Sequence, residues 1–116
     1  MPITIYSRRA GNFSVEVVSI IGRFTVGEDQ HDFRLRTREI LARNVHLLLD
    51  LAELSFADSA ALGEILAAHT AAASAGRQLK LLNPQRQFQV LLRVTRLTTL
   101  LESFDSEFDA LATYSE

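Results

Sequence analysis

Residues 47–66 read LLLDLAELSFADSAALGEIL, and this stretch decides the fold. It begins within an apolar run over residues 45–51, which is typical of a strand covered on both faces of a sheet. A short loop follows, and Asp58 with Ser59 then opens a helix over residues 59–75. Gly76 is well suited to end that helix, because glycine readily adopts the left-handed conformation after the last turn. A buried strand followed by a long helix predicts an α/β protein.

The helix over residues 59–75 is rich in alanine and has one predicted inward face. Residues at helical spacing on that face are expected to pack against the sheet. They are Leu62, Ile65, Leu66, His69, Ala72 and Ala73.

The segment before this stretch predicts a hairpin and a helix. Residues 3–9 alternate between apolar and polar, residues 10–12 supply turn residues, and residues 13–21 are rich in β-branched side chains. A loop over residues 22–27 has a glycine at each end. Residues 28–44 then predict a helix with acidic residues early and arginines late, as the helix dipole favours. Its inward face consists of Phe33, Thr37, Ile40 and Leu41.

The segment after this stretch predicts further alternation of strands and helices. Residues 78–82 form a short apolar strand, and Asn83 with Pro84 is expected to cap and start a third helix. Its inward face consists of Phe88, Leu91, Leu92 and Thr95. Residues 102–104 predict a last short strand. Asp105 or Ser106 then caps a final helix that carries Phe108, Leu111 and Ala112.

The predicted order is β-β-α-β-α-β-α-(β)-α. It indicates one α/β domain over residues 1–116, with a mixed, mostly parallel sheet, an N-terminal β-hairpin and about four helices. The 116 residues suit one domain. The formal net charge of −2 predicts no general affinity for nucleic acid, and the absence of cysteine excludes disulfides and thiolate metal sites. The N-terminus lacks a signal-peptide layout, and no apolar run is long enough to span a membrane, so we expect a cytoplasmic protein.

The pair Asp58 and Ser59 is the main candidate for a functional site. A hydroxyl at a helix start lies where backbone N–H groups have no intrahelical acceptor and the helix dipole is positive. A phosphate on Ser59 would be stabilised there, and it would add about −1.5 to −2 charges beside Asp58. The alternative is that both residues only cap the helix, because serine and aspartate are common at that position.

The surrounding pattern resembles the STAS family. Matching features are Leu49-Asp50-Leu51, Phe56, Asp58-Ser59 and Leu62-Gly63, followed downstream by Gly76, Leu79 to Leu82 and Asn83-Pro84. The ending, with Phe104, Asp105 and a helix over residues 107–111, is also similar, so the resemblance covers essentially the whole chain.

This resemblance implies a non-enzymatic bacterial switch protein, an anti-sigma factor antagonist without a cofactor. In that class a partner anti-sigma kinase phosphorylates the serine that Ser59 matches, and the phosphorylated antagonist releases its partner until a phosphatase resets it. The expected partner-binding residues are Asp58, Ser59, Ala60, Ala61, Gly22 and Arg23. A weak homodimer is a further expected association. The chain departs from the family pattern in having Ala60 and Ala61 after the serine, and Arg23 where an acidic residue is common.

Other functions remain open at this stage. A STAS protein can also be an accessory subunit of an ABC lipid transporter, bound to its ATPase, or a scaffold component of a stress-signalling complex. His31, His46 and His69 are not at metal-ligand spacing and are expected to be structural or surface residues. No nucleophile elbow or nucleotide-binding loop occurs. A basic region is either a solvated helix face or an edge that binds an acidic partner. It consists of Arg77, Lys80, Arg86, Arg93 and Arg96.

Overall fold

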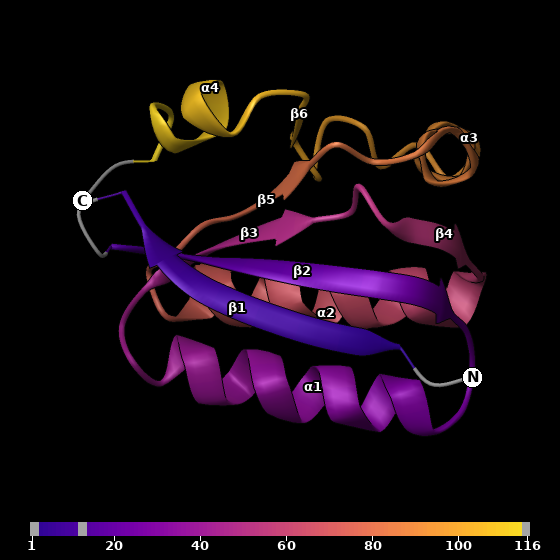
Figure 1. Ribbon diagram of the computed structural model, residues 1–116, viewed down its shortest axis with the longest axis horizontal. Coiled ribbons are helices and arrows are strands. Elements are labelled where there is room, and N and C mark those ends of the chain that lie inside the picture. Colours follow the sequence, from indigo (N-terminus) through magenta and orange to yellow (C-terminus); the bar gives the residue numbers. More distant parts are fainter. Residues whose placement is uncertain (1–2, 12–13, 115–116) are drawn as a thin grey trace.

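The computed structural model describes residues 3–11 and 14–114, so the predicted turn residue Asn12 and the predicted strand residue Phe13 lie outside the described residues. Ten elements follow one another along the chain (Figure 1). They are β1 (Thr4–Ala10), β2 (Val15–Phe24), α1 (Glu28–Leu41), β3 (His46–Asp50), β4 (Leu54–Ala57), α2 (Ser59–Ser74), β5 (Leu79–Leu82), α3 (Arg86–Val94), β6 (Ser103–Phe104) and α4 (Glu107–Leu111).

The strands form one mixed sheet in the order β1-β2-β3-β5-β6, and β4 pairs separately with the end of β2. The hairpin β1–β2 is antiparallel, whereas β2–β3, β3–β5, β5–β6 and β2–β4 are parallel. The predicted α/β class, the N-terminal hairpin, the mostly parallel sheet and the four helices are therefore confirmed. Figure 1 shows α1 and α2 on one side of the sheet, and α3 and α4 on the side nearest β5 and β6.

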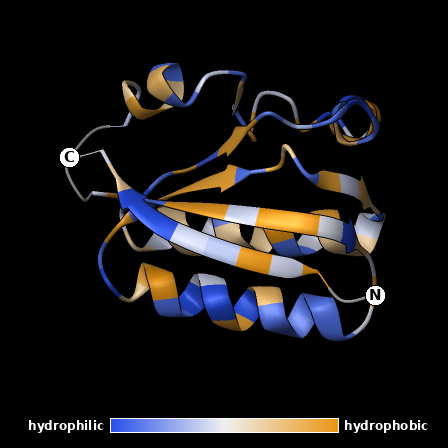
Figure 2. Cartoon of the chain, in the orientation of Figure 1, coloured by the Kyte–Doolittle hydropathy of each residue, from blue (hydrophilic) through white to orange (hydrophobic). Residues whose placement is uncertain are grey.

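The core has two layers because successive residues of a strand point to opposite faces. On the face covered by α1 and α2, Val18, Ile20 and Leu49 belong to the larger cluster of buried residues. On the opposite face Val17 and Leu48 pack with Ala110 of α4. The central strands β2, β3 and β5 are mostly hydrophobic in Figure 2, although each also carries polar residues, such as Glu16 on β2 and Lys80 on β5.

Helix α1 follows its sequence pattern closely. All four predicted inward residues are buried, and Phe33 packs against Phe24 of β2 with ring centroids 5.2 Å apart. The helix ends at Leu41 and not at residue 44, because the chain turns through Asn44, whose φ of 64° is left-handed.

The prediction of a loop over residues 22–27 is wrong for its first half. Strand β2 continues to Phe24, with a register shift between Gly22 and Arg23. The continuation has a partner that the sequence pattern did not indicate, namely β4. Strand β4 has only four residues and pairs with β2 at three positions. A strand this short shows no recognisable alternation of apolar and polar residues in the sequence.

The predicted inward face of α2 is partly wrong. Leu62, Ile65 and Ala72 are buried as expected, but Leu66 and His69 are only half-buried and Ala73 is exposed. The helix instead buries Ala61, Glu64 and Ala68. Alanine occupies so much of the helix that the apolar stripe is poorly defined, and Glu64 is tolerated inside because Arg34 of α1 binds its carboxylate with two hydrogen bonds.

The predicted start of α3 is also wrong. Asn83 does not cap the helix: its φ is 52°, and its N–H donates to the carbonyl of Phe104, which prolongs the pairing of β5 with β6. The helix begins at Arg86, with Gln85 at the N-cap position. Phe88 and Leu92 are buried, Leu91 is half-buried, and Thr95 is an exposed C-cap residue and not part of an inward face.

The C-terminal segment confirms the last strand and identifies Ser106 as the cap of α4, accepting a hydrogen bond from the Asp109 N–H. Lys80 is not on a solvated face as the basic region suggested. It is buried on β5, where its ammonium group lies 2.8 Å from the Thr113 hydroxyl oxygen and 3.3 Å from a Glu102 carboxylate oxygen. The chain end is thereby attached to the sheet.

Candidate functional site

Two helix N-termini lie together at one end of the sheet. Strands β2 and β4 run parallel, with Phe24 opposite Ala57, and each strand leads directly into a helix. The chain entering α1 therefore lies beside the chain entering α2. A backbone hydrogen bond of 3.2 Å from the Asp58 N–H to the Phe24 carbonyl joins the two segments.

Asp58 holds this junction with both carboxylate oxygens. Its Oδ1 accepts from the Ala61 N–H at 2.8 Å, which makes Asp58 the N-cap of α2. Its Oδ2 accepts from the Val26 N–H at 3.0 Å, in the loop before α1. One side chain thus satisfies a free donor of the helix start and fixes the neighbouring loop. Val26 itself presents an apolar side chain that is 70% exposed beside this junction.

Ser59 is the first residue of α2, and it is exposed. Its hydroxyl makes no hydrogen bond within the part of the chain that the structure describes, so it is not needed as the helix cap. Ala60 is half-buried, and Ala61 is fully buried beneath it. The serine hydroxyl is therefore presented to solvent at the positive end of a 16-residue helix, a location where a phosphate group is electrostatically favoured.

Gly22 and Arg23 lie on β2 next to β4, so the structure brings them to the same end of the sheet as Asp58 and Ser59. Gly22 has a φ of 110°, which requires glycine, and its carbonyl accepts from the Ser55 hydroxyl. The Arg23 guanidinium lies 4.5 Å from the centre of the Phe56 ring. This stacked pair forms a cationic, partly apolar surface beside the start of α2.

Gln87 of α3 is a positioning residue that the sequence did not reveal. Its side-chain amide accepts from the Ala57 N–H at 3.0 Å and donates to the Ala57 carbonyl at 2.9 Å. It therefore binds the free edge of β4 as a neighbouring strand would, one residue before Asp58. Nothing in a glutamine on a helix signals such a contact, because only the packing of α3 against β4 creates it.

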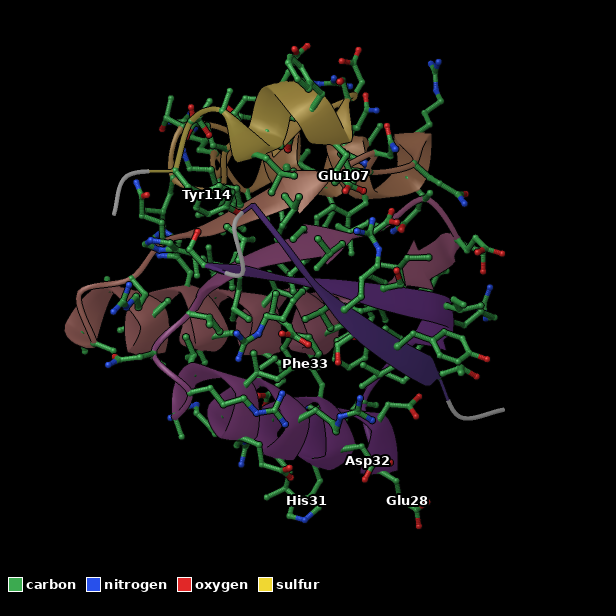
Figure 3. The ribbon with its side chains drawn as sticks, turned by 60° about the vertical axis from the view of Figure 1, so that its left-hand side comes forward. Glu28, His31, Asp32, Phe33, Glu107 and Tyr114 are labelled. Carbon is green, nitrogen blue, oxygen red and sulfur yellow. The ribbon has the colours of Figure 1, made fainter. Side chains whose placement is uncertain are left out.

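The three histidines lie apart. His31 is exposed on the outer side of α1, where Figure 3 also shows Glu28. His46 is buried on β3 and its Nδ1 accepts from the Gln78 N–H, and His69 is half-buried on α2. Among residues 3–11 and 14–114, no group of three or more histidine, aspartate or glutamate side chains is arranged to hold a metal ion.

Three groups away from this site have raised pKa values. Burial raises the pKa of the Tyr114 phenol, which donates to the Leu47 carbonyl. Hydrogen bonds to carboxylates raise the pKa of Arg8, which binds Glu107, and of Arg34, which binds Glu64. Figure 3 shows Glu107 and Tyr114 near α4, on the side of the sheet opposite α1. The groups that the site at the start of α2 presents to solvent are the Ser59 hydroxyl and the positive end of the helix dipole.

Comparison with known proteins identifies a family and a set of structures with the same fold. The family model described as "Mlab, STAS domain" matches residues 7–102. Comparison with curated protein sequences gives no match. None of the described helices is long and apolar enough to cross a membrane.

Three solved structures illustrate the range of proteins with this fold. A candidate anti-sigma factor antagonist from Thermotoga maritima has a TM-score of 0.82 and 19% identity, over 93% of this chain and 92% of the other. The Bacillus cell fate determinant SpoIIAA in its phosphorylated form has a TM-score of 0.72 and 17% identity, over 94% and 97%. The murine anion transporter Slc26a9 has a TM-score of 0.65 and 19% identity, over 85% of this chain but 17% of its own.

Proposed function

The chain belongs to the STAS domain family, and from this premise we propose that it is an anti-sigma factor antagonist whose partner binding is switched by phosphorylation of Ser59. The partner is an anti-sigma factor that is also a serine kinase, and a phosphatase restores the unphosphorylated form. The chain itself performs no catalysis in this scheme.

The main support for the proposal is that Asp58 makes the stabilising hydrogen bonds at the start of α2, whereas the Ser59 hydroxyl makes none among the described residues. Asp58 alone caps α2 and holds the loop at Val26, which leaves the Ser59 hydroxyl exposed and without a structural role among the described residues. An ordinary helix-capping serine would be bonded to the backbone of its own helix. A hydroxyl that is exposed at a helix start can enter a kinase active site without disturbing the cap.

The surface around Ser59 is suited to a protein partner when it is neutral. Val26 is exposed, Ala60 is small, and the Arg23–Phe56 stack lies on the adjoining strands. A phosphate on Ser59 would place a second negative group next to the Asp58 carboxylate. An unpaired charge in an interface costs several kcal/mol, and each loss of about 1.4 kcal/mol weakens binding about tenfold. Phosphorylation is therefore expected to release the partner.

The test begins with the site of modification. The protein is incubated with its cognate kinase and ATP, and the product is mapped by mass spectrometry. We expect phosphate on Ser59 and none on the Ser59→Ala variant. Stoichiometric phosphate on another residue, with Ser59 unmodified, would contradict the proposal.

The second part of the test measures the switch. Dissociation constants for the same partner at one salt concentration are compared among wild type, Ser59→Ala and Ser59→Asp. We expect Ser59→Ala to bind like wild type and Ser59→Asp to bind at least about tenfold more weakly. Ser74→Asp is the matched control, because it adds the same charge at the opposite, exposed end of α2.

A second candidate function is an accessory subunit of an ABC lipid transporter. The description of the matching family model names Mlab, and the Slc26a9 structure shows the fold within a transporter. Ala60 and Ala61 after the serine also depart from the usual antagonist pattern. Equal partner affinities for wild type, Ser59→Ala and Ser59→Asp would favour this candidate, or a scaffold role, over the phosphorylation switch.

A further inference from the structure

The basic region noted in the sequence forms a distinct surface in the fold. Residues 65–101 contain no aspartate or glutamate but five of the twelve lysine and arginine residues of the chain. Lys80 is buried, whereas Arg86, Arg93 and Arg96 are exposed on α3 and the turn that follows it. Within the described part of the chain, these three arginines form no ion pair.

Exposed apolar side chains accompany these arginines. Val90 and Val94 lie one turn apart on α3, and Val94 is 72% exposed. Arg96 has a left-handed φ of 61° at the position after the α3 C-cap, where glycine would be favoured. We call the surface of Arg86, Val90, Arg93, Val94 and Arg96 the basic strip.

Helix α4 carries the opposite chemistry on the same side of the molecule. Phe108 is 82% exposed, and the exposed carboxylates of Asp105 and Asp109 flank it in the sequence. In the described structure neither carboxylate has an ion-pair partner. We call these three residues the acidic strip.

The two strips are neighbours across one cleft. An open cleft of about 820 Å³ lies between α3 and the β6–α4 segment, and both Arg93 and Asp105 line it. Apolar groups on its walls include Leu92 and Phe104. Figure 1 shows α3 and α4 at the two ends of the side of the molecule that lies furthest from α1. A basic apolar strip, a cleft and an acidic aromatic strip therefore follow one another along this side.

We propose that this side is a self-complementary surface through which two copies of the chain form a two-fold dimer. A two-fold axis along the line of sight of Figure 1, at the middle of this side, exchanges its two ends. The basic strip of one copy then faces the acidic strip of the other, and the same contact occurs twice, as in any isologous interface. In this dimer Phe108 of each copy faces the cleft or the valines of the partner's basic strip. Asp105 and Asp109 face the arginines of that strip.

The size of the surface is adequate for a weak dimer. The molecule measures 33 × 25 × 23 Å along its principal axes, so contact over the whole of a face along the longest axis would correspond to roughly the ~800 Å² per partner of a standard interface, and contact over part of it suits a weaker dimer. A second copy is favoured over a different acidic protein because the chain itself carries the complementary strip. Helix α2 contributes nothing to this surface, so the dimer and the Ser59 switch can be tested independently.

The test is a charge exchange followed by sedimentation velocity over a range of protein concentrations at low salt. Arg93→Glu and Asp109→Arg, each alone, are expected to weaken the dimer at least about tenfold, because each creates two like-charge contacts per dimer. The double variant Arg93→Glu/Asp109→Arg is expected to recover affinity to within about threefold of wild type, as coupled charges do. Raised salt should weaken the wild-type dimer.

Controls make the outcome decisive. Arg38→Glu makes the same charge change at an exposed position on α1, on the opposite side of the molecule, and is expected to leave the dimer unchanged. Phe108→Ser should weaken the dimer without altering the circular dichroism spectrum, because that side chain is solvent-exposed in the single chain. A wild-type protein that stays monomeric at about 500 µM, a concentration that corresponds to a binding free energy of only about −4.5 kcal/mol, would overturn the proposal. Dimers that are insensitive to both single charge reversals would overturn it equally, since the contact would then lie elsewhere.

Discussion

Replacing Asp58 by alanine is expected to destabilise the protein by two separable contributions. The variant loses the N-cap hydrogen bond to the Ala61 N–H, which is worth about 1 kcal/mol. It also loses the hydrogen bond from the Val26 N–H to the carboxylate, which is exposed but has a charged acceptor and is worth about 1–2 kcal/mol. The expected loss of unfolding free energy is therefore about 2–3 kcal/mol, or a fall in Tm on the order of 10 °C for a chain of this size.

Asp58→Asn separates the two contributions. The amide oxygen of asparagine can still accept from the Ala61 N–H, but its NH2 group cannot accept from the Val26 N–H. We expect this variant to lose about 1 kcal/mol, roughly half the loss of Asp58→Ala or less. Amide hydrogen exchange should show faster exchange at Val26 in both variants, and at Ala61 only in Asp58→Ala.

Urea denaturation of wild type and the two variants measures these differences. Asp105→Ala is the matched control, because that exposed carboxylate forms no hydrogen bond or ion pair in the described structure, and its loss should cost under about 0.5 kcal/mol. If Asp58→Ala and Asp58→Asn were equally destabilised, the bond to the loop would contribute nothing measurable. If neither differed from wild type, the account of the junction would be refuted.

Three further changes follow from the structure. Ile65→Ala should cost about 2–5 kcal/mol of unfolding free energy, whereas Leu66→Ala, at a half-buried position, should cost under about 2 kcal/mol. Urea titrations that gave the reverse order would show that α2 turns a different face to the core. Arg96→Gly should raise the unfolding free energy by about 0.5–1 kcal/mol by relieving the left-handed φ, and an unchanged or lower Tm would contradict this. Burial raises the pKa of Tyr114, so above pH ~10 unfolded chains lose a proton that the native state keeps, and stability falls as pH rises. Tyr114→Phe should therefore lose less stability than wild type between roughly pH 9 and 11, the range in which an ordinary tyrosine titrates. If the unfolding free energies of both proteins fell equally steeply with pH, Tyr114 would make no such contribution.

Much of the fold was encoded locally and could be predicted from the sequence. The apolar run around Leu48 places leucines on both faces of a strand, so it indicates a central strand, and the spacing of Phe33, Thr37 and Ile40 defines one helix face. Glycine at position 76 ends α2 because its φ of 72° is favourable for glycine. The position of Ser59 at a helix start was likewise predictable from Asp58 and the helical pattern after it.

Other features depend on contacts between distant segments, and no local pattern could reveal them. Strand β4 exists because β2 continues beside it and Gln87 of α3 binds its other edge. Asn83 looked like a helix cap, but pairing with Phe104 holds it in a left-handed turn. Local sequence determines which segments can be strands or helices, because propensity and periodicity act over a few residues. Only the tertiary structure decided that Asp58, besides capping α2, also binds Val26, since that second bond joins residues 32 positions apart.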